Sequence, residues 1–260
     1  MLKRFDDFWF MTRLRYECFR PARTFSIIPS SKLVYIAVQK AGCTSIRAAI
    51  GRDANGGKAV GNVHSAEHSG IPGIREFGVS KFRQLLADEE VFVFTFVRNP
   101  FSRITSLYTD KIGPVPLGEN NPFMNGLRRS LKKSALRNLD QNAPMPFEDY
   151  VEHVCETCHK RVNLHWNLMS DIIPNDLVRI DHVGKLESFE ADMQPVLDRM
   201  HHRKPARQDL SKPRNVSRNE LKKTVVWDSA SVEKVIAAYS RDFERFSYAP
   251  ELPGELLINC

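Results

Sequence analysis

Long apolar runs are missing from this 260-residue sequence. No stretch approaches the roughly 20 consecutive apolar residues that a membrane-spanning helix requires. The apolar stretch at residues 8–11 is also too short for the core of a signal peptide. We therefore expect neither a transmembrane segment nor a signal peptide, and predict a cytoplasmic protein.

Cysteine is scarce, and its number is odd. The five cysteines do not suggest a disulfide framework, and the single C-x-x-C, formed by Cys155 and Cys158, has no second pair at zinc spacing. We expect reduced thiols on a helix and no bound metal. A reducing cytoplasm fits this composition best.

The P-loop of ATP-binding enzymes is absent too. That loop requires the pattern G-x-x-x-x-G-K-[ST] after a strand. The nearest approach, at residues 51–58, has the wrong spacing, has no hydroxyl residue after its lysine, and follows a predicted helix. This argues against a kinase.

Charge of one sign is in excess. There are 38 Lys and Arg against 31 Asp and Glu, a formal net charge of +7. Such a surplus favours anionic partners, among them nucleic acid, anionic lipid, phosphorylated nucleotides and acidic glycans. The basic, aromatic N-terminal residues 1–25 are expected to pack on the domain, with a peripheral membrane contact as the alternative.

Continuous apolar runs predict two buried strands, at residues 33–38 and 91–97, and a third strand is predicted at 176–183. Buried strands alternating with helices predict a parallel sheet with both faces covered. Residues 113–146, with a basic stretch at 128–137, are interpreted as a substrate-facing insertion or a solvated helix. The predicted helices span residues 46–50, 79–90, 101–111, 147–161, 186–200 and 232–246.

The first candidate binding segment follows the first strand directly. It offers a flexible backbone, hydroxyl groups and one mobile cation at the start of a helix, where unpaired amides and the helix dipole favour a phosphate. An ordinary strand-to-helix turn is the alternative. The residues are Lys40, Ala41, Gly42, Cys43, Thr44 and Ser45.

The second candidate segment follows the second strand. Arg98 stands at the carboxyl end of that strand, where open parallel sheets bind ligands. Ser106 comes eight residues later, within the next predicted helix. A guanidinium suits a phosphate well, so we expect both residues to converge on one phosphate.

The two segments together resemble those of carbohydrate sulfotransferases of the chondroitin, dermatan and HNK-1 type, a family that uses 3'-phosphoadenosine 5'-phosphosulfate. Residues 40–45 are similar to the family's 5'-phosphosulfate loop, and residues 96–106, with Tyr108 and Lys111, are similar to its 3'-phosphate motif. Further similar segments follow in the same order over residues 32–248. They lie at 147–150, 165–166, 181–188, 239–243 and 246–248.

The resemblance implies an α/β fold, a P-loop NTPase-like three-layer sandwich with a central parallel sheet flanked by helices. It implies sulfuryl transfer to a carbohydrate hydroxyl by in-line displacement, without a metal. Lys40 would stabilise the leaving phosphate oxygen, and residues 40–45 would cradle the 5'-phosphate. Arg98 and Ser106 would hold the 3'-phosphate. Three divisions of the chain follow: a basic segment 1–30, one sulfotransferase domain 31–250 and a tail 251–260.

A second group must accept the proton of the acceptor hydroxyl. Residues 63–68, between the two cofactor segments, occupy the region where related enzymes often carry a base. We assign this role to His64, with Glu67 and His68 as alternatives. His165, beside Trp166, either helps to shape the acceptor cleft or packs as part of a helix.

The sequence departs from the family's pattern at three points. Gln39 stands where the family usually has proline, residues 172–178 lack the usual paired cysteines, and an anchor helix is missing. These departures suggest a relative working in a reducing cytoplasm, as in bacteria. Two alternatives remain: a non-catalytic basic module that binds nucleic acid or an anionic glycan, and a sulfotransferase for a tyrosine, lipid or small alcohol. For the sulfotransferase we expect no nucleic-acid partner.

Overall fold

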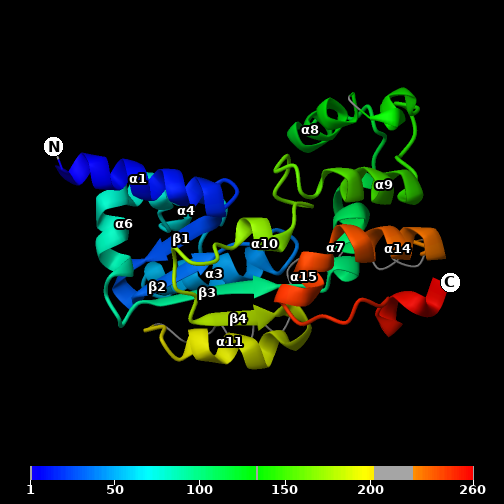
Figure 1. Cartoon of the computed structure of the whole chain (residues 1–260). Coiled ribbons are helices and arrows are strands. Elements are labelled where there is room, and N and C mark those ends of the chain that lie inside the picture. Colours follow the sequence, from blue (N-terminus) through cyan, green and yellow to red (C-terminus); the bar gives the residue numbers. More distant parts are fainter. Residues whose placement is uncertain (1, 133, 202–224, 260) are drawn as a thin grey trace. The chain divides into compact units, whose positions relative to one another are not determined.

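The computed structural model describes residues 2–132, 134–201 and 225–259 (Figure 1). The chain forms two compact units. One combines Met1–Arg98 with Met169–Arg214, and the other combines Asn99–Leu168 with Asn215–Cys260. These units divide the predicted single domain of residues 31–250, whose extent stays a prediction.

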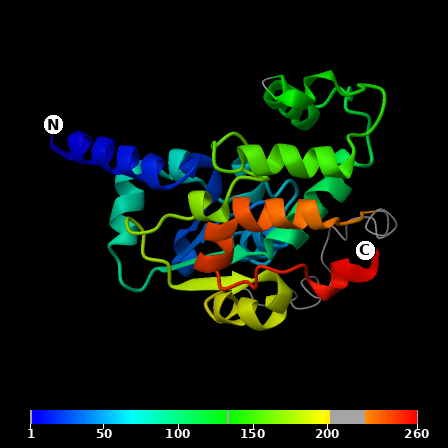
Figure 2. The same cartoon turned by 45° about the vertical axis from the view of Figure 1, so that its right-hand side comes forward.

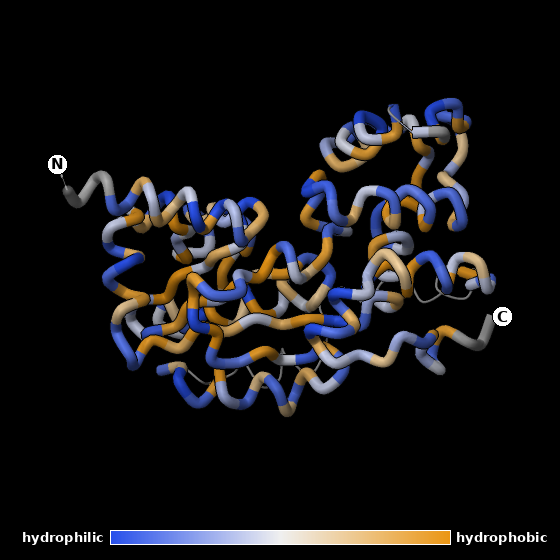
Figure 3. The backbone as a smooth tube through the Cα atoms, viewed as in Figure 1, coloured by the Kyte–Doolittle hydropathy of each residue, from blue (hydrophilic) through white to orange (hydrophobic). Residues whose placement is uncertain are grey.

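The first unit contains a four-stranded sheet of order β1-β2-β3-β4. The strands are β1 (Phe25–Ile28), β2 (Leu33–Ile36), β3 (Phe92–Val97) and β4 (His182–Lys185). β2, β3 and β4 pair in parallel, and β1 pairs with β2 antiparallel. The first three strands are buried throughout, as the continuous apolar runs at β2 and β3 predict, and Figure 3 shows their apolar colouring.

Helices cover both faces of this sheet. On one face, α3 (Cys43–Ala54) and α11 (Phe189–Leu197) pack against the rings of Tyr35 and Phe94. On the other face, Phe82 of α6 (Val79–Leu86) meets the ring of Phe25 on β1 at 5.3 Å. The sequence therefore predicts the α/β class and the flanking helices correctly. The remaining helical segments of this unit are α1 (Leu2–Glu17), α2 (Pro21–Thr24), η1 (Pro29–Ser31), α4 (Ala66–Ser69), α5 (Ile74–Phe77), α10 (Met169–Ile172) and η4 (Leu186–Ser188).

Two strand predictions need correction. The sheet is not wholly parallel, because the unpredicted strand β1 is an antiparallel edge. The third strand begins at His182 rather than at residue 176. The Glu17 carboxylate accepts hydrogen bonds from the Asp176 and Leu177 amides, at 3.2 and 2.9 Å. These backbone amides therefore have a side-chain partner in place of a neighbouring strand.

The described residues of the second unit form helices joined by turns and loops, and no strand. Figure 2 shows α9 (Phe147–Thr157) and α14 (Ser229–Ala238) side by side. α8 occupies Pro122–Leu131 of the predicted insertion and buries Met124, Leu127 and Leu131, so this part is a helix packed on one face. The predicted helix 232–246 is divided at Tyr239. The other helical segments are α7 (Pro100–Leu107), η2 (Tyr108–Ile112), η3 (Ala135–Asn138), α15 (Ser240–Arg245) and η5 (Gly254–Asn259).

Candidate functional site

The loop between β2 and α3 has an unusual backbone. Lys40 and Gly42 adopt left-handed conformations, with φ angles of 68° and 78°. Ala41 between them is fully buried, and α3 begins at Cys43. Two positive φ angles in three residues turn the chain sharply from the end of β2 into the helix.

The N-terminus of α3 lacks a side-chain cap. Gly42 occupies the cap position and has no side chain with which to accept a hydrogen bond. The first amides of a helix have no partner within the helix, so those at Cys43, Thr44 and Ser45 are suited to an external acceptor. Together with the dipole of the 12-residue α3, they form an arrangement that favours a phosphate.

Two buried polar atoms near the start of α3 are also suited to binding an anion. Within the described residues, the Tyr35 hydroxyl and the Arg47 Nε are buried without a hydrogen-bond partner. Burial raises the pKa of Tyr35 well above its usual value, with Cys43 as a second cause. Buried polar atoms without partners are costly, and a bound anion would supply an acceptor for an N–H or O–H donor.

The segment that follows β4 packs against the loop at Gly42. A Cβ placed on Gly42 would lie 2.9 Å from the Leu186 Cδ1 and 3.8 Å from the Phe189 ring. The positive φ angle of Gly42 also disfavours any larger residue. Both facts explain why glycine stands at this position.

Arg98 is joined directly to the loop. Its Nη1 donates a hydrogen bond to the Lys40 carbonyl oxygen at 3.2 Å. Arg98 follows β3 and Lys40 follows β2, and these strands are parallel neighbours. The structure thus places Arg98, the first residue after β3, against the loop that follows β2 at one edge of the sheet.

Ser106, the other residue assigned to the 3'-phosphate, belongs to the second unit. It lies on α7 and is 4% exposed. Asn99 begins this helix by accepting the Phe101 amide hydrogen on its side-chain oxygen at 2.9 Å. The convergence of Arg98 and Ser106 on one phosphate stays a prediction.

His64 lies beside the loop. Its Nε2 is 3.3 Å from the Thr44 hydroxyl, and its Nδ1 is 3.1 Å from the Arg47 Nη1. The His64 amide is held by the Asn62 side chain at 3.0 Å. His64 thus forms a hydrogen bond with a residue of the candidate loop, Thr44.

The contact with Arg47 determines which ring nitrogen of His64 carries hydrogen. A guanidinium has only donors, so Nδ1 must accept the bond. In the neutral ring the hydrogen is then on Nε2, which donates to the Thr44 hydroxyl oxygen. The lone pair that a base needs is on Nδ1, opposite the Arg47 guanidinium.

The alternative bases are both exposed. Glu67 and His68 lie on the short helix α4, and the His68 Nδ1 contacts the Ser65 hydroxyl at 2.9 Å. The assignment of the base to one of these three residues stays a prediction.

Three of the later segments that resemble the family, at residues 147–150, 165–166 and 239–243, belong to the second unit and contribute buried side chains there. The buried Tyr239 donates to the Trp166 carbonyl oxygen at 2.6 Å, and Tyr150 donates to the Ile104 carbonyl oxygen at 3.2 Å. Trp166 is 2% exposed, and His165 contacts the Asn163 side chain at 2.8 Å. Residues 164–166 form a turn, so the alternative that His165 packs as part of a helix is wrong.

Burial suppresses thiolate formation at Cys155 of the C-x-x-C pair. The cysteines of the described residues are free, and burial raises the pKa of the Cys155 thiol to about 12, with neighbouring Cys158 as a second cause. A thiol with so high a pKa carries almost no thiolate at neutral pH. In the described parts of the chain, no group of three or more His, Cys, Asp or Glu residues is arranged to hold a metal ion.

The family assignment comes from comparison with known proteins. A model described as the sulfotransferase family matches residues 23–249. The chain belongs to the sulfotransferase family. The matched residues include both candidate segments. No solved structure gives a significant match.

Several curated relatives of this sulfotransferase family member are carbohydrate sulfotransferases. Carbohydrate sulfotransferase 14 of Danio rerio is 25% identical over 178 residues, covering 65% of this chain and 46% of the relative. The Homo sapiens protein of that name is 26% identical over 164 residues, covering 62% and 43%. Carbohydrate sulfotransferase 10 of Gallus gallus is 25% identical over 142 residues, covering 52% and 39%. The chain therefore spans less than half the length of these relatives.

The helices that the structure describes include none with both the length and the apolar character of a membrane span. The predicted location in the cytoplasm remains a prediction. A further basic stretch, between residues 203 and 218, lies outside the described residues.

Proposed function

We propose that the protein transfers the sulfuryl group of 3'-phosphoadenosine 5'-phosphosulfate to a hydroxyl of a carbohydrate. The observation that carries this proposal is the hydrogen bond from the Arg98 Nη1 to the Lys40 carbonyl oxygen at 3.2 Å. It joins the two segments that would hold the two phosphates of a single nucleotide. The matching family and the names of the relatives support the reaction class.

In this proposal the fold is P-loop NTPase-like, with the loop after β2 in the position of the phosphate loop. The amides of Cys43, Thr44 and Ser45 bind the 5'-phosphate, and Arg98 with Ser106 binds the 3'-phosphate. Arginine forms strong, charge-assisted hydrogen bonds with phosphate oxygens. The protein is of the bacterial, cytoplasmic type and uses no metal in this step.

Lys40 acts on the leaving group. As the acceptor oxygen bonds to sulfur, the bond from sulfur to the 5'-phosphate oxygen breaks, and its electron pair stays on that oxygen. The Lys40 ammonium stabilises this developing charge. Because the charge is greatest in the transition state, the interaction increases the rate rather than merely tightening binding.

His64 accepts the proton of the acceptor hydroxyl. The lone pair on its Nδ1 faces Arg47, so the hydroxyl must displace the guanidinium to reach that nitrogen. The bond between His64 Nε2 and Thr44 keeps the ring beside the loop meanwhile. The products are the sulfated carbohydrate and adenosine 3',5'-bisphosphate.

The decisive test combines binding with turnover. Wild-type protein should bind adenosine 3',5'-bisphosphate in calorimetry and should release it from labelled donor when an oligosaccharide panel is supplied, with mass spectrometry locating the sulfate. Lys40→Ala should lower kcat by about 10²–10³-fold, the usual effect of losing one transition-state donor. Lys58→Ala, at an exposed lysine of the following loop, is the matched control. A protein with no affinity for the bisphosphate would refute the proposal.

A further inference from the structure

The segment at residues 251–256, which follows α15, is attached to the second unit by two leucines (Figure 1). Leu252 and Leu256 are half-buried and pack against the apolar core of that unit. Gly254 and Glu255 between them are exposed, and the Leu256 amide donates to the Pro253 carbonyl oxygen at 2.8 Å. The sequence analysis treats these residues only as part of a tail.

Glu255 of this segment is bonded to the second candidate segment. Its carboxylate accepts a hydrogen bond from the Ser102 hydroxyl at 2.9 Å, across 153 positions of the chain. Ser102 lies on α7 and is 3% exposed, so a buried donor is paired with a carboxylate that reaches it from the surface. Among the residues that the structure describes, Glu255 forms no ion pair, so no neighbouring cation neutralises its charge.

Ser102 lies one helical turn before Ser106, the residue assigned to the 3'-phosphate. The two serines are four positions apart in α7, so they share one face of the helix, with Cβ atoms about 5–6 Å apart. Ser106 is 4% exposed, and within the described part of the chain its hydroxyl forms no hydrogen bond. The Glu255 carboxylate therefore lies next to a hydroxyl that still lacks an acceptor.

A carboxylate on Ser102 disfavours a phosphate on Ser106. Both groups are anions, and like charges at so short a separation repel each other. Both groups also use the hydroxyls of the same helix face as donors. Occupation of this face by Glu255 and occupation by a phosphate are therefore alternatives.

We infer that Glu255 is an autoinhibitory residue, whose carboxylate occupies the 3'-phosphate site until the nucleotide displaces it. The inference rests on the proposed function, since it takes Ser106 to hold the 3'-phosphate. A ligand that binds only the open form has its apparent affinity reduced by the fraction of molecules that are open. The contact thus weakens binding of the donor and of the bisphosphate product alike, and so favours product release after transfer.

The test removes the charge and keeps the hydrogen bond. In Glu255→Gln the side-chain oxygen can still accept from the Ser102 hydroxyl. In calorimetry on the full chain, this variant should bind adenosine 3',5'-bisphosphate about five- to tenfold more tightly than wild type, as expected when one unit charge near the phosphate is removed. Its affinity for adenosine 5'-phosphate, which places no anion at this site, should be unchanged.

Glu251→Gln is the matched control, because this exposed glutamate of the same segment carries an equal charge. It should leave both affinities unchanged. Leu252→Ser provides an independent variant, since it loosens the attachment of the segment without altering its charge. It should also tighten binding of the bisphosphate alone, and circular dichroism confirms the fold of each variant.

Three results would overturn the inference. They are an unchanged or weaker affinity of Glu255→Gln for the bisphosphate, an equal gain for both nucleotides, and an equal gain with Glu251→Gln. Normal bisphosphate binding and sulfuryl transfer without any effect of Glu255 refutes the autoinhibitory contact alone. Absence of bisphosphate binding in the wild type and in every variant refutes the proposed function, and the inference with it.

Discussion

Arg47 donates to the His64 Nδ1 at 3.1 Å, while the Thr44 hydroxyl lies 3.3 Å from the other nitrogen of the same ring. The imidazole is therefore held between a cation and the loop that we assign to the 5'-phosphosulfate. An asparagine oxygen at this position can replace Nδ1 as the acceptor for Arg47 but cannot act as a base. A substitution of His64 by asparagine therefore separates the contact with Arg47 from the acceptance of a proton.

We expect His64→Asn to lower kcat by about 10²–10⁴-fold, the usual contribution of general base catalysis. Its affinity for adenosine 3',5'-bisphosphate should stay within about twofold of wild type, because the Arg47 contact is retained. Steady-state kinetics and calorimetry measure the two quantities. Glu67→Gln and His68→Asn are the controls, and a larger fall in kcat for either would transfer the role of base to that residue.

Arg98→Ala should weaken binding of adenosine 3',5'-bisphosphate by about 10–100-fold, since a charge-assisted hydrogen bond contributes about 1.5–3 kcal/mol. Acceptor affinity should change little. Adenosine 5'-phosphate, which lacks the 3'-phosphate, separates the two contacts of this side chain.

If Arg98 acts on the 3'-phosphate, its removal should affect the bisphosphate far more than the monophosphate. An equal loss for both nucleotides would show that the bond to the Lys40 carbonyl oxygen is its main contribution. Ser106→Ala should follow the same pattern with a smaller effect, because a neutral hydroxyl forms a weaker bond.

Gly42→Ala should destabilise the protein by about 1–2 kcal/mol through the left-handed backbone alone. The close approach of the new Cβ to Leu186 adds to that cost. Gly61→Ala is the matched control in the same unit, because nothing lies within 4 Å of its Cβ position. Thermal unfolding measures the difference, and equal melting temperatures for the two variants would contradict the described loop geometry.

Protonation of His153 should destabilise the second unit in acid. Burial lowers the pKa of His153 from 6.5 to about 4, with Lys160 as a second cause. The unfolded chain therefore binds a proton between these pH values while the folded chain does not, so stability falls as the pH decreases from 6.5 towards 4. The loss approaches about 3 kcal/mol.

Denaturant unfolding followed by tryptophan fluorescence across this pH range measures the effect. His153→Gln should flatten the pH dependence, because a glutamine does not titrate. The exposed His159 provides the control, and His159→Gln should retain the wild-type slope. An unchanged slope in the His153 variant would assign the acid sensitivity to other groups.

Local sequence pattern was sufficient to predict the centre of the fold. Apolar runs at residues 33–38 and 91–97 mark β2 and β3, and the positions of Lys40 and Arg98 directly after them predict their meeting at one sheet edge. Parallel strands place their carboxyl ends together, so this part follows from periodicity alone.

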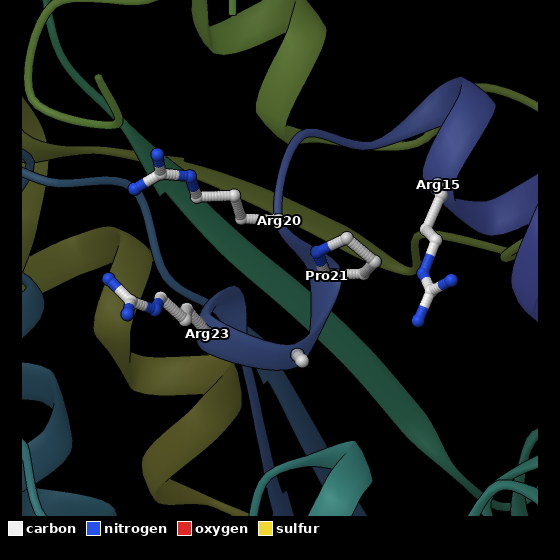
Figure 4. Close-up of a pocket in the computed structure, with 5 residues that line it drawn as sticks. Arg15, Arg20, Pro21 and Arg23 are labelled. Carbon is white, nitrogen blue, oxygen red and sulfur yellow. The ribbon is translucent and has the colours of Figure 1, made fainter. Parts of the chain in front are cut away.

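The features that the sequence pattern did not predict depend on tertiary contacts. Strand β1 has only four residues, and a run this short is ambiguous between helix and strand. β4 starts late because a side chain of α1 binds the preceding residues: the Glu17 carboxylate accepts the Asp176 and Leu177 amide hydrogens. The partnership of Arg23 (Figure 4) with Arg47 joins residues 24 positions apart, which no local pattern reveals.

The packing of Leu186 against Gly42 makes the proposed phosphate loop depend on residues more than 140 positions later in the chain. A truncated chain ending before β4 would retain every residue of the loop but would lack Leu186 and Phe189, which pack against it. During synthesis, the chain should therefore bind the nucleotide only after α11 has been made. Limited proteolysis at sites far from the loop should likewise abolish nucleotide binding, if it removes the segment that contains Leu186.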